Sequence, residues 1–239
     1  MGRAHEVRKK AMAATNAAKT KVYAKYGKEV YLAARSGVPD PNMNDGLRRV
    51  IERAKRAQVP SDVIKRNIDK AKSGTGENYE AIMYEGFGPS NSSFVVECLT
   101  DNINRTVSNI RSYFTKAHGK LGVTGSATFG YNHYAVITLS GLNAEAVLET
   151  LLMGDVDIID VEEDGEFTTI YAAPHKLDLV KDTILASHPN INIEEDEVTW
   201  IPNEYISLTT QEDLDLFNRL VGFLQEDDDV QDFYHNVQE

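Results

Sequence analysis

The sequence predicts an α+β protein in which an N-terminal three-helix-type bundle is followed by two ferredoxin-like α/β domains, one inserted into the other. The spacing of apolar residues supports this fold class. It is typical of helices in residues 1–80, and it alternates between strand-like and helix-like spacing in residues 81–239. The charge of the chain changes at the same place. Residues 1–80 hold 18 Lys and Arg against 9 Asp and Glu, and the remaining chain holds 7 against 28. The formal net charge of −12 therefore averages a basic part and an acidic part.

The basic part is expected to fold as a small helical bundle, since none of its helices is apolar all round. Residues 5–36 are typical of helix in two pieces, with a break at 16–20. The next amphipathic helix ends before Pro60, because the residue before a proline disfavours helical geometry. A third helix is expected to be capped by Ser61 and to end at Gly74.

The stretch from Tyr84 to Arg111 organises the rest of the chain. It predicts a strand, a turn at residues 85–89, a second strand at 94–99, and a helix that begins after oxygen caps at residues 100–102. One arc of this helix is apolar. The opposite arc is polar and consists of Arg105, Asn109, Ser112 and Lys116.

The remaining pattern alternates strands and helices. The predicted elements are strands at 126–129 and 134–139, a helix at 143–153, a hairpin around Asp164-Gly165, a helix at 174–186, strands at 191–201 and 205–208, a helix capped by Thr209 with Glu212, and a last strand at 230–237. The unit begun at 83–129 lacks a second helix and a final strand, which residues 204–237 supply. The domains are therefore predicted as 1–78, 79–130 with 203–239, and an acidic insertion at 131–202.

Several kinds of chemistry find no support in the sequence. No apolar run approaches the ~20 residues of a membrane span, and the start is polar. The single cysteine, Cys98, is typical of a reducing cytoplasm, and the six histidines lack metal-ligand spacing. The glycines at 119–125 lack the Lys-Ser/Thr ending of a phosphate-binding P-loop, so a plain connection is expected. The acidic run Asp227–Asp229 is predicted to be a solvated turn. We therefore expect a cytoplasmic protein without catalytic residues, metal or cofactor, and favour a monomer.

The basic surface is the best candidate for function, and it predicts a binding site for nucleic acid. The alternative is an ordinary solvated surface, against which stands the twofold basic excess over 80 residues. No recognition-helix or zinc-finger signature is present, so affinity is expected from phosphate contacts rather than from base reading. The predicted binding residues are Lys9, Lys10, Lys19, Lys21, Lys25, Lys28, Arg48, Arg49, Arg53, Arg56, Lys65, Arg66, Arg105 and Lys116.

Three separated stretches resemble the signature of the YebC/PmpR family. They are Tyr84–Pro89 with Val96–Thr106, the terminal Asp228–Val237, and Arg35–Gly37 with Asp40–Asn42 and Pro60–Asp62. The chain opens with Gly2-Arg3-Ala4-His5-Glu6, where the common form has Ala-Gly-His-Ser-Lys-Trp, and is in this respect similar to the YeeN-like subgroup. Any role of that missing Trp does not carry over.

The resemblance implies three domains and a cytoplasmic or mitochondrial location. Most members of the family are described as probable transcriptional regulators that bind DNA. Some members instead act in translation, including factors that relieve ribosome stalling. Both functions stay open for this chain. The absence of a base-reading motif favours a ribosome-associated factor that contacts ribosomal RNA, because RNA is recognised largely by shape.

Overall fold

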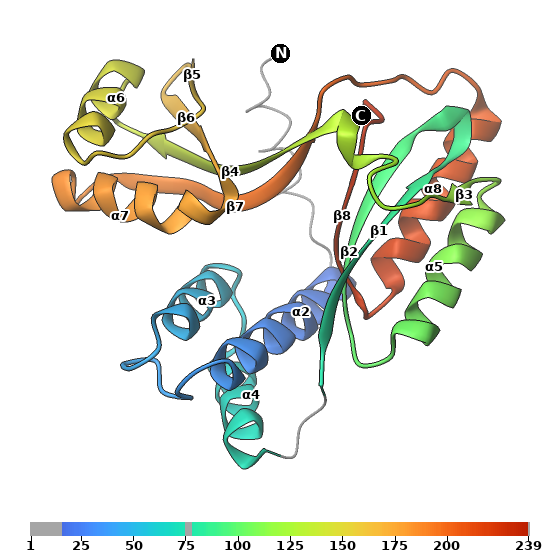
Figure 1. Ribbon diagram of the computed structural model, residues 1–239, viewed down its shortest axis with the longest axis horizontal. Helices are drawn as coiled ribbons and strands as arrows, with labels where there is room; N and C mark the ends of the chain where they lie inside the picture. Colours follow the sequence, from blue (N-terminus) through green and yellow to red (C-terminus); the bar gives the residue numbers. More distant parts are fainter. Residues whose placement is uncertain (1–15, 75–77, 239) are drawn as a thin grey trace. The chain divides into compact units, whose positions relative to one another are not determined.

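The computed structural model describes residues 16–74 and 78–238, with the backbone alone for residues 16–20 (Figure 1). Within these residues the protein is α+β, with seven α-helices and two four-stranded antiparallel sheets, which confirms the predicted fold class. Gly130–Asn203 form one compact unit, and the described residues before and after them form the other. The finer division into three domains stays a prediction.

The larger unit begins with three helices, α2 (Asn16–Arg35), α3 (Asp45–Arg56) and α4 (Ser61–Ser73). Apolar side chains spaced by three or four residues bring Val30, Leu47, Ile51, Ile64 and Ile68 into a common core. Burial of each side chain contributes about 1.5–3 kcal/mol to the bundle.

Two predicted details of these helices are wrong. Residues 16–20 are helical, so they do not form a break. Ser61 is the first residue of α4, and the preceding Pro60 occupies the cap position without a side-chain hydrogen bond. Its fixed φ of −60° and extended ψ of 141° set the entry of the chain, and its carbonyl accepts from the amides of Val63 and Ile64. Gly74 ends α4 at φ +67°, as predicted.

The sheet of the larger unit has the strand order β3-β1-β2-β8. Its strands are β1 (Glu80–Phe87), β2 (Ser93–Thr100), β3 (Lys120–Leu121) and β8 (Val230–His235). The last strand returns from the far end of the sequence and pairs antiparallel with β2, so that Val95 lies opposite Tyr234. The smaller unit is thus inserted within the chain of a discontinuous sheet (Figure 1).

Helices α5 (Ile103–Lys116) and α8 (Gln211–Glu226) pack on one face of this sheet. The rings of Phe94 and Phe114 meet edge to face with centroids 5.7 Å apart, and Phe217 and Leu220 of α8 complete the core. Gly86 of β1 is needed here, because a Cβ at this position would lie 2.5 Å from the ring of Phe114.

The turn predicted at residues 85–89 is wrong in its first half. Residues 85–87 belong to β1, and the chain reverses at Pro89–Asn91.

The smaller unit has the ferredoxin-like order β-α-β-β-α-β. Its elements are β4 (Tyr131–Ser140), α6 (Ala144–Met153), β5 (Asp160–Asp164), β6 (Phe167–Ala172), α7 (Leu177–Ser187) and β7 (Asn192–Pro202), and its sheet has the order β5-β6-β4-β7. Side chains from α6 and α7 form the core with β4 and β6, including Ile137, Leu151, Ile170 and Ile184. The tight turn between β5 and β6 is Gly165-Glu166, one residue later than predicted.

Two predicted elements near the C-terminal part also differ. Residues 205–208 form no strand; Ile206 makes a single parallel bridge to Val237. The cap of α8 is Thr210 rather than Thr209, and its side chain accepts from the amide of Asp213 at 3.1 Å. Asp213 therefore replaces the predicted Glu212 in the capping motif, because its carboxylate also accepts from the Thr210 hydroxyl.

The predicted strand at 126–129 is absent because the backbone amides of this loop bind Glu85. The Glu85 side chain on β1 is buried, and its carboxylate accepts from the amides of Gly125, Ala127 and Thr128 at 2.7, 2.6 and 2.8 Å. Burial raises the pKa of this carboxyl, but the amide hydrogen bonds outweigh burial and lower it below the usual value. The amides at the end of the glycine-rich stretch and just after it therefore bind a carboxylate of the chain itself.

Replacing Glu85 by glutamine should lower the free energy of unfolding at neutral pH by about 2 kcal/mol, because charge-assisted hydrogen bonds to the loop are lost. The folded-state pKa of Glu85 is depressed, so its contribution is complete above the unfolded value of about 4.5 and is lost as the pH falls through the folded value. Urea unfolding at several pH values should show the difference between the two proteins shrinking below pH 4.5. A difference that is independent of pH would contradict this role.

Candidate nucleic-acid interface

The fourteen residues predicted to bind nucleic acid fall into different environments. Lys9 and Lys10 lie outside the described residues, and Lys19 lies on α2 where only the backbone is described. The other residues divide into lysines of α2 that contact α8 or the sheet of the same unit, two residues on α5, and arginines and lysines on α3 and α4.

Lys21 of α2 reaches the C-terminal end of α8. Its Nζ donates hydrogen bonds to the carbonyls of Leu224 at 2.9 Å and Gln225 at 2.7 Å. The last turn of α8 contains no basic residue of its own, so Lys21 supplies the positive charge that the negative end of a helix favours. Burial lowers the pKa of Lys21 below its ordinary value.

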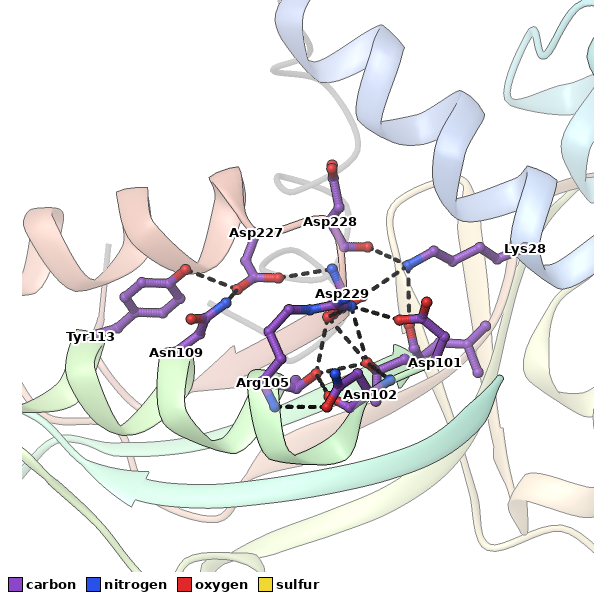
Figure 2. Close-up of polar contacts among 12 residues, drawn as sticks. Lys28, Asp101, Asn102, Arg105, Asn109, Tyr113, Asp227, Asp228 and Asp229 are labelled. Carbon is purple, nitrogen blue, oxygen red and sulfur yellow. Dashed lines mark hydrogen bonds and ion pairs between the residues drawn. The ribbon is translucent and has the colours of Figure 1, made fainter. Parts of the chain in front are cut away.

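Lys25 and Lys28 continue the same face of α2, at spacings of four and three residues. Lys25 forms an ion pair with Asp232 on β8. The Lys28 ammonium donates to the carbonyls of Leu99 at 3.1 Å and Asp228 at 2.7 Å, and lies 3.4 Å from a carboxylate oxygen of Asp229 (Figure 2). The side chain of Lys28 is only 15% exposed. Lys25 and Lys28 therefore attach α2 to strands β8 and β2, and Lys21 attaches it to the end of α8.

Asp229 is the centre of this attachment, and we refer to Lys28, Thr100, Arg105, Thr106 and Asp229 as the Asp229 cluster. One carboxylate oxygen of Asp229 accepts from Arg105 at 2.7 Å, Thr106 at 3.0 Å and Thr100 at 3.1 Å (Figure 2). Burial raises the pKa of Asp229, but the hydrogen bonds from Arg105 and Thr106 outweigh it and lower the pKa. The cluster joins α2 to the end of β2, the start of α5 and the residue before β8.

The polar face of α5 is also directed at the acidic turn Asp227–Asp229. Arg105 binds Asp101 at 2.8 Å as well as Asp229, and the Tyr113 hydroxyl donates to Asp227 at 2.9 Å. Burial and this hydrogen bond raise the pKa of Tyr113 to about 12. The ammonium of Lys116, by contrast, lies 5.2 Å from the ring centroid of Phe223.

The prediction that Asp227–Asp229 form a solvated turn is wrong, since Asp227 and Asp229 are buried. Their partners on β2, α5 and α2 lie more than 100 residues away in the sequence. The signal that the sequence did contain is a basic helix with lysines at positions 21, 25 and 28, and a separate run of three aspartates with complementary charge.

The basic residues of α3 and α4 have a different environment. Arg53 binds Glu29 of α2 at 3.1 Å, and Arg49 is half-buried. Arg48 is exposed and pairs with Asp45 one turn away at 2.8 Å, a contact of small energetic value in water. We define the α3/α4 basic set as the exposed basic residues of α3 and of the first two turns of α4, which are Arg48, Lys55, Arg56, Lys65 and Arg66. Lys72, which is also exposed, lies in the last turn of α4, 3.8 Å from Asp69.

Other groups offer little reactive chemistry. Cys98 is buried within β2, and burial raises its pKa to about 12, so the thiol is protonated at neutral pH. Within the described ranges, no cluster of three or more His, Cys, Asp or Glu side chains has an arrangement able to hold a metal ion. None of the helices in the described part of the chain has both the length and the apolar character needed to cross a membrane.

The chain belongs to the TACO1/YebC family. The family model described as the TACO1/YebC protein N-terminal domain matches residues 3–74, and the model described as the TACO1/YebC second and third domain matches residues 79–237. The resemblance noted in the sequence is thereby confirmed.

Individual relatives match along nearly the whole chain. A protein from Acholeplasma laidlawii is 49% identical over 237 residues, covering 99% of this chain and 98% of its own, and one from Alteromonas mediterranea is 46% identical over 238 residues with the same coverage. Both are named probable transcriptional regulatory proteins. The crystal structure of a conserved hypothetical protein from Aquifex aeolicus has a TM-score of 0.73 at 32% identity, covering 93% of this chain and 91% of that chain.

Proposed function

We propose that the protein is a non-enzymatic, nucleic-acid-binding regulator of gene expression that contacts phosphates through the α3/α4 basic set. The observation that carries this proposal is the division of the basic residues. Lys21, Lys25 and Lys28 bind carbonyls and carboxylates of the chain itself, whereas the α3/α4 basic set is exposed to solvent. The names of the relatives, which refer to regulation of transcription, support the regulatory role.

The side chains of α3 and α4 suit contacts to the phosphate backbone, and the two helices lack a free amide side chain for reading adenine, although arginine can also bind guanine. Adenine is usually read by Asn or Gln, and Asn67 is the only such residue on the two helices. Its amide nitrogen donates to the carbonyl of Val63 at 2.9 Å within α4. Lysine and arginine bind phosphate in any sequence, and a folded RNA offers a shape that such contacts recognise. We therefore favour a ribosome-associated translation factor that contacts ribosomal RNA in the cytoplasm, with a DNA-binding transcriptional regulator as the alternative.

Sedimentation of ribosomes from cells that contain the full-length protein tests this proposal. The protein should sediment with ribosomes at about 50 mM salt and should be released at about 200 mM, because counterion release makes phosphate contacts strongly salt-dependent. Nuclease treatment should abolish the association. Selection from a library of promoter fragments should yield no preferred sequence. Sequence-specific binding to a promoter, together with no ribosome association at low salt, would show that the DNA alternative is correct.

A further inference from the structure

Helix α6 of the smaller unit presents apolar side chains to solvent. Leu152 and Met153 are each 80% exposed, and Leu148, one turn before Leu152, is 46% exposed. Two neighbouring segments add Ile159, just before β5, and Leu179 on α7, both also exposed and both on elements that contact α6. We call these five residues the α6 patch. Exposed apolar side chains gathered on neighbouring elements mark candidate interaction sites.

Acidic residues surround the α6 patch. Glu145 and Glu149 are exposed on α6, and Asp155 lies two residues after its end. The whole smaller unit, Gly130–Asn203, holds 15 Asp and Glu against Lys176 and Lys181 alone, a formal charge of −13. The last turn of α6 carries no basic residue, so the negative end of its helix dipole adds to the acidic field. The surface therefore favours a partner that is both apolar and cationic.

In the larger unit, a basic helix already contacts the acidic end of another helix. Helix α8 also lacks a basic residue in its last turn and is followed by Asp227 and Asp228. There the basic helix α2 supplies Lys21 to the last carbonyls of α8, and Lys28 to the acidic turn that follows. At the end of α6 the corresponding carbonyls, of Leu151 and Leu152, accept from the backbone amides of Val156 at 2.9 Å and Asp155 at 3.1 Å, so the open feature of this end is its exposed acidic side chains.

We propose that the α6 patch docks a basic amphipathic helix of another protein. Its apolar side would cover Leu148, Leu152 and Met153, and its lysines or arginines would reach the exposed carboxylates of Glu149 and Asp155, in the mode by which amphipathic helices bind apolar surfaces. A second copy of this chain fits poorly, because a symmetric contact brings two acidic units of charge −13 together. The inference concerns the acidic unit and does not depend on the nucleic-acid site.

Fluorescence anisotropy with the full-length protein and a labelled synthetic peptide tests the proposal. The probe is an 18-residue peptide with leucines on one helical face and lysines on the other, and its control has the same composition in scrambled order. At physiological salt the amphipathic peptide should bind at least tenfold more tightly than the scrambled one. The double variant Leu152→Ser/Met153→Ser should bind both peptides equally, since only charge attraction remains. Both side chains are largely exposed, so the variant is expected to fold normally.

A matched control is offered by Val123→Ser/Phe129→Ser, which removes two side chains that are 77% and 83% exposed in the larger unit. This variant should keep the preference for the amphipathic peptide. Equal binding of both peptides by the unaltered protein would overturn the proposal, as would equal losses in the two variants. Dimers that dissociate on Leu152→Ser/Met153→Ser would assign the patch to a second copy. Peptide binding that appears only after removal of residues 1–15 would assign it to the chain's own basic segment, and either result would overturn the partner-helix proposal.

Discussion

Replacing Lys65 and Arg66 of α4 by glutamate should weaken binding of RNA or DNA by about 10- to 100-fold and lower the salt slope by about two. Both side chains are exposed, belong to the α3/α4 basic set, and stand on a helix whose core side is fixed by Ile64 and Ile68. The reversal therefore removes phosphate contacts without disturbing packing, and the free energy of unfolding should stay within about 0.5 kcal/mol of the unaltered protein. Binding titrations at several salt concentrations give both quantities.

The matched control for this experiment is Arg111→Glu/Arg219→Glu, which changes the net charge equally at exposed positions on α5 and α8. If the α3/α4 basic set forms the contact surface, the control should lose much less affinity. Equal losses in the two double variants would mean that overall charge, rather than this surface, governs binding. Reversal of Lys25 or Lys28 is unsuitable as a control, because those side chains hold α2 on the sheet.

Replacing Asp229 by alanine should lower the free energy of unfolding by about 3 kcal/mol, which is typical of breaking a largely buried ion pair by removing one partner. The change leaves the hydroxyls of Thr100 and Thr106 without their carboxylate and removes the charge opposite Lys28 and Arg105. The folded-state pKa of Asp229 is depressed, so its contribution is complete above the unfolded value of 3.8 and is lost as the pH falls through the folded value. Urea unfolding at neutral pH measures the difference.

The neighbouring Asp228 provides the control, because its side chain is exposed and Lys28 binds only its backbone carbonyl. Asp228→Ala should therefore change the stability by no more than about 0.5 kcal/mol. A combined Lys28→Ala/Asp229→Ala variant should be less destabilised than the sum of the two single changes, since the two residues interact directly. Comparable effects of Asp228→Ala and Asp229→Ala would show that the Asp229 cluster does not hold α2 in place.

Local pattern was sufficient to predict most of the fold. Helix α5 follows from the apolar spacing of Ile103, Val107, Ile110 and Phe114 and from the cap at Asn102, which accepts from the Arg105 amide at 3.0 Å. The errors arise where distant residues decide the local structure. The loop before β4 is not a strand because its amides bind Glu85, about 40 residues earlier. The strand propensity of residues 126–129 contains no information about this distant contact.

The candidate site was predictable in kind but not in detail. The basic excess of residues 1–80 is evident from composition, and a charge count treats every lysine alike. Only the tertiary arrangement separates Lys28, which binds the carbonyl of Leu99 and the carboxylate of Asp229, from Lys65, which is exposed. The distinction depends on pairing β8 with β2 across the sequence, a long-range contact that periodicity does not encode.

The late return of β8 to β2 also has a consequence for synthesis of the protein. Strand β2 ends at Thr100 and β8 begins at Val230, so about 130 residues must be added before the partner strand exists. At a translation rate of ~5–20 residues per second, the edge of β2 that pairs with β8 stays without its partner strand for roughly 6–26 s. An open apolar strand edge is a template for aggregation. The acidic unit, whose strands are contiguous in sequence, can fold during that interval, and its high negative charge keeps the unfinished polypeptide soluble while the larger sheet remains incomplete.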